Sequence, residues 1–533
     1  MTGLIQRARE RVQRFVARRE AEASARRFVA FCQRKWPVNP AAREDSVVLL
    51  GYFPHKIATY CNGHVANYIA RRTNSRLETF AIYGRRDPLA REAYHAMGAQ
   101  LGLDQSHGEP RREEMQKKAD EIFAGLKTKW DLLALRYEGL KIGDLIYDTY
   151  LRFYEEPTVK LEDPRLRELI FQTLFIYAAV DNYLKTKKVV AFIADDYCYH
   201  ECGVLTRLLM RRGVPIYIVC FGSQFFLYKL YGEEETGWDD YPIRWPYHAY
   251  PKVFRTLPSA EQERCLAIGK KYVEDKLAGK FDRFTLRDRS AFAESDDKVF
   301  TDSGKPRIVV LLHDFIDAPH GFRWMLFPDF YDWIYFLLEK ASETDFEWYI
   351  KPHPSSWDPK RQGISRVNMG VVDDLLKRFP KIKLLEPTVS NRQIVKEGIA
   401  AMFTMYGTAG HEFARLGIPT VNAGDNPHIA YHFNYHPTTV EEYADLIARA
   451  DQLKCEGSHR EIDEYCFMNF FYTRGYLSTG ANPLPPAFFE DSTYEMKCAA
   501  NNGYDLFILP HDAQREAEVE KSYDAFFHDL PKA

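Results

Sequence analysis

Three groups of polar residues in the second half of the chain have the chemistry to bind a phosphorylated substrate. The first group is His313, Asp314 and Asp317, which follow an apolar run that ends at Leu312. In open α/β sheets, ligands bind outside the carboxyl ends of the strands. These three residues are therefore candidates for a substrate site, and capping of the following helix is the alternative.

The second group is Lys351 and His353, and each of them precedes a proline. The prolines restrict the backbone and hold the two side chains in fixed directions. Both side chains can donate charge-assisted hydrogen bonds to a phosphate, and both can stabilise the negative charge that grows on a departing nucleotide. We predict that Lys351 and His353 bind phosphate and that His353 also acts in catalysis. The alternative is a turn in which the histidine only packs.

The third group stands at a predicted strand-to-helix turn. Small residues there let a phosphate approach the backbone, and a helix N-terminus offers free N–H groups and a positive dipole end. A threonine hydroxyl adds a contact, and a glutamate one turn into the helix can accept ribose hydroxyls. The spacing differs from the G-x-G-x-x-G dinucleotide fingerprint. The predicted nucleotide-binding residues are Gly407, Thr408, Gly410, His411 and Glu412.

Two adjacent carboxylates in the first half of the chain, Asp195 and Asp196, follow the apolar run 189–194. One of two neighbouring carboxylates can hold a proton while the other stays charged. Transfer of an activated group to a hydroxyl needs a carboxylate as the base towards that hydroxyl or as the nucleophile towards the transferred group. Either aspartate is thus a catalytic candidate, and a helix N-cap is the alternative. His55 and His200 are further candidates for the site.

A metal site is considered at His200, which stands between Cys198 and Cys202. Metal sites more often use two-residue gaps between ligands, and no second ligand pair follows. We therefore expect a structural role for these residues, no metal ion and no cofactor.

Apolar runs alternate with helix-like segments in two sets along the chain, which predicts two parallel sheets covered by helices on both faces. The predicted strands are 46–50, 77–83, 189–194 and 215–220, then 307–312, 347–350, 382–385, 400–403 and 419–421. Residues 86–150 are expected to be mostly helical. The predicted fold class is therefore α/β, with two Rossmann-like domains that face a central cleft.

The domain organisation follows from these two sets. The predicted parts are a basic helical extension (1–45), a first Rossmann-like domain (46–240), a linker region (241–303), a second Rossmann-like domain (304–455) and C-terminal helices that cross back to the first domain (456–533).

Composition excludes some classes of function. The formal net charge of −3 over 533 residues lacks the basic excess of a general nucleic-acid binder. No apolar run approaches the ~20 residues that span a bilayer, and the N-terminus lacks the apolar core of a secretory signal. We expect a cytoplasmic protein. Residues 4–36 predict a long, arginine-rich helix that either lies on anionic lipid at the inner face of the plasma membrane or packs on the protein itself.

Together these motifs resemble those of bacterial GT-B glycosyltransferases of capsule and surface-polysaccharide synthesis. The similarity is strongest to capsule transferases that use CMP-Kdo (CMP-activated 3-deoxy-manno-octulosonic acid). It extends to the His-Pro motif of bacterial CMP-sialic acid transferases and to teichoic-acid polymerases that use CDP-glycerol. The residues that carry it are 313–317, 351–354, 407–412 and 417–419, within a similar stretch of about 305–430.

The resemblance implies a metal-independent GT-B transferase with the nucleotide sugar in the second domain and a glycan or glycolipid acceptor in the first. His353 corresponds to the histidine that contacts the donor phosphate. The family has a pair of hydroxyl residues at the later helix start, of which this chain keeps Thr408. Sialyltransferases have an acidic pair followed by glycine, whereas Asp195 and Asp196 are followed by a tyrosine. Three alternatives stay open: a CDP-glycerol glycerophosphotransferase-like enzyme, a sugar-nucleotide epimerase and a non-catalytic glycan-binding scaffold.

Overall fold

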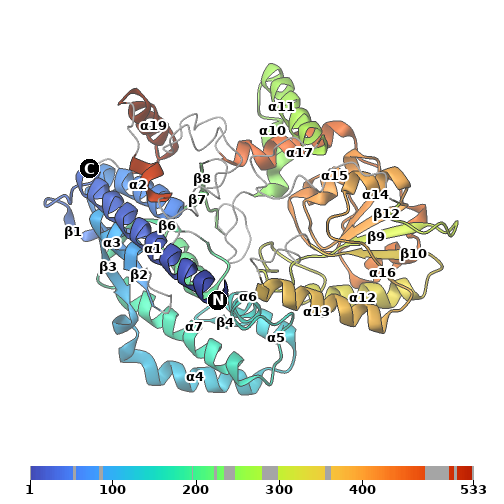
Figure 1. Cartoon of the computed structure of the whole chain (residues 1–533), viewed down its shortest axis with the longest axis horizontal. Coiled ribbons are helices and arrows are strands. Elements are labelled where there is room, and N and C mark those ends of the chain that lie inside the picture. The colour runs from blue at the N-terminus through green and yellow to red at the C-terminus, as the bar shows by residue number, and fades with distance from the viewer. Residues whose placement is uncertain are drawn as a thin grey trace.

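The computed structural model describes residues 2–51, 56–82, 88–194, 196–220, 225–232, 246–278, 298–353, 362–474, 503–508 and 513–530. Two sheets organise the chain, one in each half of the sequence (Figure 1). Two predicted site residues, His55 and Asp195, lie outside the described residues, and so does Pro354.

The first sheet has the strand order β3-β2-β1-β6-β7-β8. Its strands pair in parallel, except that β8 runs antiparallel to β7. The bounds are β1 Arg43–Leu50, β2 Ser75–Ala81, β3 Ala99–Asp104, β6 Lys188–Ala194, β7 Ile216–Cys220 and β8 Phe226–Lys229. Strands β2 and β3 extend the sheet to one side of β1 and β6 to β8 extend it to the other. The winding direction therefore changes between β1 and β6.

Helices cover both faces of this sheet, because alternate side chains of each strand point to opposite faces. Leu49 and Phe192 pack with α4, α6, α7 and α8, whereas Leu50 and Ile193 pack with α2 and α3. The bounds are α2 Lys56–Thr73, α3 Pro88–Ala96, α4 Arg112–Gly125, α5 Lys129–Leu133, α6 Gly143–Tyr154, α7 Pro164–Tyr183 and α8 His200–Met210, with a small hairpin of β4 Arg136–Tyr137 and β5 Leu140–Lys141.

The second sheet is parallel throughout and has the strand order β11-β10-β9-β12-β13. Its bounds are β9 Arg307–Leu311, β10 Glu347–Lys351, β11 Lys383–Leu384, β12 Ala401–Thr404 and β13 Thr420–Asn422. Here the winding direction changes between β9 and β12. Ile308 and Val310 pack with α12, α13 and α16 on one face, and Val309 packs with α14 and α15 on the other. These helices are α12 Phe330–Ser342, α13 Gln362–Arg378, α14 Asn391–Glu397, α15 Ala409–Arg415 and α16 Val440–Ala448.

Three helices form a separate apolar cluster beside the second sheet: α10 Tyr250–Phe254, α11 Ser259–Leu277 and α17 His459–Phe470. Helices α11 and α17 cross closely at Gly269, where an added Cβ would lie 1.9 Å from the carbonyl oxygen of Asp463. A glycine is needed there because two helix backbones meet.

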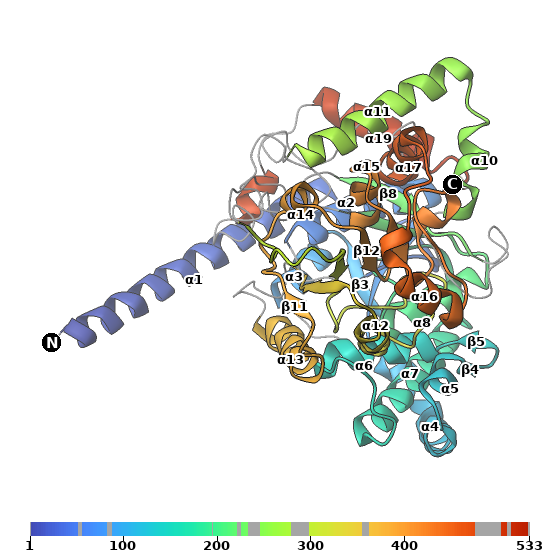
Figure 2. The same ribbon diagram turned by 90° about the vertical axis from the view of Figure 1, so that its right-hand side faces the viewer.

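The two ends of the chain pack together on the first domain. Helix α1 (Thr2–Lys35) is buried along its second half, and its first half extends away from the body of the protein (Figure 2). The 3-10 helix η11 (Gly503–Ile508) brings Phe507 against Tyr60 of α2 at a ring-centroid distance of 5.0 Å. In α19 (Ala513–Phe526), the Tyr523 hydroxyl lies 3.3 Å from Nδ1 of His64. The other 3-10 helices are η1 Gln105–His107, η2 Glu109–Arg111, η3 Tyr247–Ala249, η7 Pro427–Ala430, η8 Ala450–Gln452 and η9 Tyr472–Arg474.

The predicted α/β class with two Rossmann-like domains, the GT-B architecture, is confirmed by the two sheets and their helices. Residues 86–150 are mostly helical, as expected, but strands β3, β4 and β5 were not predicted there, and β3 adds an edge strand to the first sheet. Gly98, which has a φ of 90°, ends the preceding helix and starts this strand. Helix α17 lies within the predicted C-terminal helical segment 456–533, and it packs against α11 beside the second sheet. Among the described helices, none is long and apolar enough to cross a membrane.

Candidate functional site

The first and third predicted groups meet where the second sheet changes winding direction. His313 follows β9, and its Nε2 lies 3.0 Å from Oγ1 of Thr404, the last residue of the neighbouring strand β12. The backbone N–H of Tyr406 donates to the same nitrogen at 3.5 Å. These contacts place the loops after β9 and β12 side by side at the usual ligand position of an open α/β sheet.

The His313 side chain is a neutral hydrogen-bonding group in this setting. Its ring stacks on Phe330 with a centroid distance of 4.6 Å. Burial, together with a smaller contribution from the positive charge of the nearby His353, lowers the pKa of His313 to about 3. Because Nε2 accepts the Tyr406 N–H, the ring proton is on Nδ1. His313 can thus donate one hydrogen bond but supplies no charge.

The second group joins from the other side of β9. Lys351 is the last residue of β10, is 5% exposed, and its carbonyl oxygen accepts the Leu312 N–H at 3.0 Å. His353 is half-buried and close enough to His313 to affect its pKa. The three predicted groups therefore follow three neighbouring strands, β10, β9 and β12, with the two cationic candidates on one side of His313 and the glycine turn on the other.

The turn after β12 is shaped by Gly407 and Thr404. The Gly407 N–H donates to Oγ1 of Thr404 at 3.3 Å, and an added Cβ at Gly407 would lie 2.8 Å from the same oxygen. Thr408, at the N-cap of α15, is exposed and makes no cap hydrogen bond with its side chain. Thr404 was not predicted as a site residue. Its position as the polar residue directly after the apolar run 400–403 could have indicated it.

The remaining residues of the third group are in the first turn of α15, and they are buried. An added Cβ at Gly410 would lie 2.6 Å from Nδ2 of Asn434, and the His411 side chain is fully buried. Glu412 is 4% exposed; it pairs with Nζ of Lys276 on α11 at 2.8 Å and accepts from Asn391 at 3.3 Å. The geometry therefore assigns the Glu412 carboxylate to an ion pair that joins α11 to α15.

The two aspartates after β9 have different surroundings. Asp314 is buried and accepts a hydrogen bond from Nδ2 of Asn368 at 3.2 Å; burial raises its pKa, and the charge of Asp317 adds to the shift. Asp317 is exposed and lies 3.4 Å from the Tyr199 hydroxyl of the first domain. The loops after β9 and β6 therefore touch.

Asp196 stands after β6, at the switch point of the first sheet. The half-buried carboxylate accepts the Cys198 N–H at 3.3 Å. Burial raises the pKa of Asp196 to about 6, although the backbone N–H groups of Cys198 and Tyr199 oppose the shift. Such a carboxylate is charged at neutral pH and basic enough to take a proton. Because Tyr199 contacts Asp317, this loop faces the second domain.

His200 and its cysteine neighbours are parts of the first core. The ring Nδ1 of His200 lies 3.2 Å from Oγ1 of Thr173, and burial lowers its pKa to about 3. Cys198 and Cys202 pack against the same apolar cluster. In the part of the chain that the structure describes, no group of three or more His, Cys, Asp or Glu residues is arranged to hold a metal ion.

A buried polar contact that the sequence did not reveal joins the two domains. His320 approaches Asp148 of α6 through Nδ1 at 2.5 Å and the Pro328 carbonyl through Nε2 at 3.0 Å. Both ring nitrogens face acceptors, so a protonated ring satisfies both. Burial opposes protonation of His320, but the Asp148 carboxylate outweighs it and raises the pKa. Asp329, which is fully buried, accepts from the hydroxyls of Tyr147 and Thr158 at 2.5 Å each.

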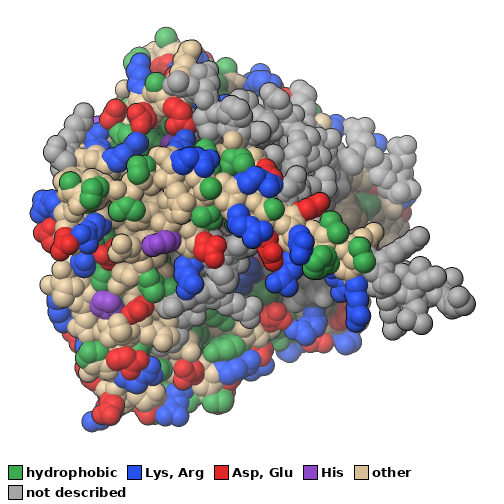
Figure 3. Space-filling model, turned by 60° about the vertical axis from the view of Figure 1, so that its left-hand side comes forward, with side chains coloured by type: hydrophobic (Ala, Val, Ile, Leu, Met, Phe, Trp, Pro, Cys, Tyr) green, Lys and Arg blue, Asp and Glu red, His purple; other side chains and the backbone are tan. Residues whose placement is uncertain are grey.

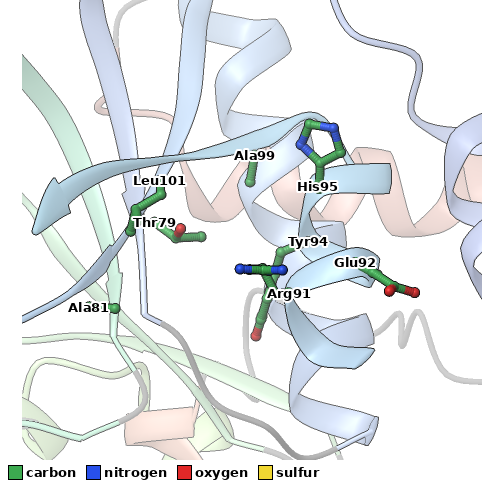
Figure 4. Close-up of a pocket in the computed structure, with 8 residues that line it drawn as sticks. All are labelled: Thr79, Ala81, Arg91, Glu92, Tyr94, His95, Ala99 and Leu101. Carbon is green, nitrogen blue, oxygen red and sulfur yellow. The ribbon is translucent and has the colours of Figure 1, made fainter. Parts of the chain in front are cut away.

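A pocket of about 350 Å³ lies on the first domain between α3, β2 and β3 (Figure 4). Its floor contains Thr79, Tyr94 and Ala99, and its rim contains Arg91 and His95. It lies at the β3 edge of the first sheet, away from β1 and β6 at the switch point, and none of the predicted site residues lines it.

Comparisons with known proteins give only a distant likeness. No protein-family model and no curated protein sequence matches the chain. A UDP-GlcNAc 2-epimerase from Neisseria meningitidis is similar in structure with a TM-score of 0.23 and 11% identity, over 80% of this chain and 98% of that chain. HepE of Anabaena in complex with UDP-glucose has a TM-score of 0.25 and 9% identity, over 85% of this chain and 99% of that chain. The wall teichoic acid polymerase TagF has a TM-score of 0.20 and 8% identity, over 96% of this chain and 100% of that chain. Scores at this level assign no family, so the site is interpreted from its own geometry.

Proposed function

We propose that this protein is a glycosyltransferase that moves a sugar from a nucleotide-activated donor to a polysaccharide acceptor. One observation carries the proposal: Lys351, His353, His313 and the Gly407 turn follow three neighbouring strands at the switch point of the second sheet. Nucleotides bind at such points in open α/β sheets.

The donor phosphate is assigned to the second domain. Lys351 and His353 supply positive charge to the leaving phosphate. The first N–H groups of α15 and the exposed Thr408 hydroxyl supply hydrogen bonds. Because these groups neutralise the phosphate, the proposed reaction needs no divalent metal ion. The proposed donor is CMP-linked, with Kdo as the favoured sugar on the basis of the His-Pro motif, and the acceptor is a surface or capsular polysaccharide.

The acceptor is assigned to the first domain, where Asp196 acts as the base. The Asp196 carboxylate takes the proton of the acceptor hydroxyl, and the hydroxyl oxygen attacks the anomeric carbon of the sugar. The bond from that carbon to the phosphate oxygen breaks, and its electron pair leaves with the nucleotide. A pKa of about 6 suits this role at neutral pH. Asp195 remains the second candidate of the pair.

Thermal stability with CMP, CDP, UDP and GDP, each with and without EDTA, tests the donor assignment. A ligand that binds only the folded state raises the melting temperature. We expect CMP to do so, EDTA to change nothing, and His353→Ala to remove the shift while the exposed His528→Ala keeps it. A preference for a diphosphate would move the donor to another class. No shift with any nucleotide would overturn the proposal and leave the glycan-binding scaffold.

Product analysis separates the remaining enzymatic alternatives. A glycosyltransferase forms a glycoside, a CDP-glycerol transferase forms a phosphodiester, and a sugar-nucleotide epimerase changes its donor without any acceptor. We expect a glycoside and no turnover of CMP-Kdo into an epimer when acceptor is omitted.

A further inference from the structure

Helix α1 has two apolar faces that point in opposite directions. In the second half, Ser24, Ala25, Phe28 and Cys32 are 0–3% exposed and face the protein. In the first half, Val12, Phe15 and Val16 are 63%, 57% and 48% exposed. With about 100° of rotation per helical residue, the exposed apolar stripe lies roughly 180° from the buried one.

The position of the exposed stripe excludes packing on the domain that carries it. A helix buried on one side along its length would keep its apolar residues on one face. Here the stripe turns to the other side at the point where α1 leaves the body of the protein (Figure 2). Val12, Phe15 and Val16 therefore face solvent in the isolated chain, and a contact with another surface would bury them.

The charge beside the stripe indicates which surface this is. Residues 2–20 contain six arginines and two glutamates, whereas the whole chain has a net charge of −3. Arg11 and Arg18 are exposed about a quarter turn from the stripe, and Arg14 is exposed on the opposite face. The Arg19 guanidinium lies 4.8 Å above the Phe15 ring. Figure 3 shows hydrophobic side chains next to Lys and Arg side chains on this side of the molecule.

We propose that the first half of α1 lies in the interface of an anionic lipid bilayer, with Val12, Phe15 and Val16 among the acyl chains and the arginines at the headgroups. A helix with an apolar stripe between basic side chains binds in this way, and each basic residue near the surface strengthens the binding. Two copies of α1 would instead bring their arginines together, which opposes a helix dimer. The proposal does not depend on the identity of the sugar donor.

Co-sedimentation of the full chain with vesicles tests the proposal. We expect binding to phosphatidylglycerol–phosphatidylcholine vesicles, none to phosphatidylcholine alone, and weaker binding as salt rises. Phe15→Glu should weaken binding by about tenfold or more, because it removes a large apolar side chain and adds a negative charge. Gln13→Glu adds the same charge outside the stripe and should weaken binding by no more than about fivefold.

Two outcomes would overturn the proposal. One is no binding of the full chain to anionic vesicles, and the other is equal loss of binding in the two variants. A dimer in light scattering that Phe15→Glu dissociates would assign the stripe to a second copy of the chain and so also overturn it. Both variants should melt at the temperature of the parent, since both positions are exposed, so a loss of binding cannot be due to unfolding.

Discussion

Replacing Lys276 by methionine should destabilise the second domain strongly. Lys276 and Glu412 form an ion pair at 2.8 Å, with side chains that are 6% and 5% exposed. Methionine keeps the length of the side chain but leaves the carboxylate buried without its cation. Removing one partner of a buried pair costs about 3–5 kcal/mol. We expect Lys276→Met to lower the free energy of local unfolding by this amount in the region that contains α15.

Native-state hydrogen exchange on peptides from β12 and α15 measures this free energy where the pair lies. A global unfolding midpoint is less suitable, because a chain with two domains need not unfold in one step. Lys270→Met is the matched control, since Lys270 is on the same helix, is 56% exposed and lies 3.9 Å from Glu274; it should change exchange little. The double variant Lys276→Met/Glu412→Gln should recover most of the stability, because no charge remains buried.

Two results would refute this reasoning. Equal exchange in Lys276→Met and Lys270→Met would mean that the Glu412 carboxylate is stabilised by other groups. Additive losses in the double variant would mean that the two residues do not interact. The double variant also tests the predicted ribose contact of Glu412. If the carboxylate only joins α11 to α15, nucleotide binding should survive in this variant.

Three further predictions concern pH, catalysis and helix packing. Stability should fall as pH drops from about 6.5 towards 3, because buried histidines stay neutral in the folded state while the unfolded chain takes up protons. Each contributes about 1.4 kcal/mol per pH unit, which buried carboxylates with a raised pKa such as Asp196 partly offset. Histidine NMR signals that titrate at about pH 6.5 in the folded protein would contradict the prediction. The residues whose pKa is lowered to about 3, mainly by burial, are His200, His313 and His436. The value of kcat should rise with pH through about 6 as Asp196 loses its proton. Asp196→Asn should abolish most turnover. Full activity in that variant would exclude Asp196 as the base. Gly269→Ala should lower the free energy of unfolding by about 1–3 kcal/mol, because the added methyl group pushes α11 away from α17. Gly125→Ala is the control and should leave stability unchanged, because the space around an added Cβ is open. Equal melting temperatures of the two variants would refute the close helix crossing.

Strand positions were predictable because parallel strands buried on both faces are continuous apolar runs. Val47 to Leu50 and Ile308 to Val310 are fully buried, as such runs imply. Strand β3 was not predicted, because its residues include an exposed Leu101 and the small Gly102 at the sheet edge, which weakens the apolar signal. Edge strands have one solvent-facing side and carry less sequence information.

The approach of the three polar groups in the second domain follows from strand order, which local sequence does not specify. The sequence places His313, Lys351 and Gly407 each after a strand, and only the order β10-β9-β12 makes these strands neighbours. The partners of Glu412 and of His320 could not be predicted, because Lys276 and Asp148 are more than a hundred residues away in the chain. The residues that follow one strand do not indicate which distant helix will pack against them.

The packing of both chain ends on one domain bears on the order in which the protein folds during synthesis. Residues 2–229 contain the strands of the first sheet, but α19 and η11, which cover α2, come from residues 503–530. At about 5–20 residues per second, the ribosome needs some tens of seconds to make the intervening segment. During this time, Tyr60 and His64 have no cover from the C-terminal segment, and the second domain, whose sheet ends at residue 422, can complete its fold first. The first domain to begin is thus the last to finish, and its buried aromatic cluster is the surface that a chaperone would meet on the nascent chain.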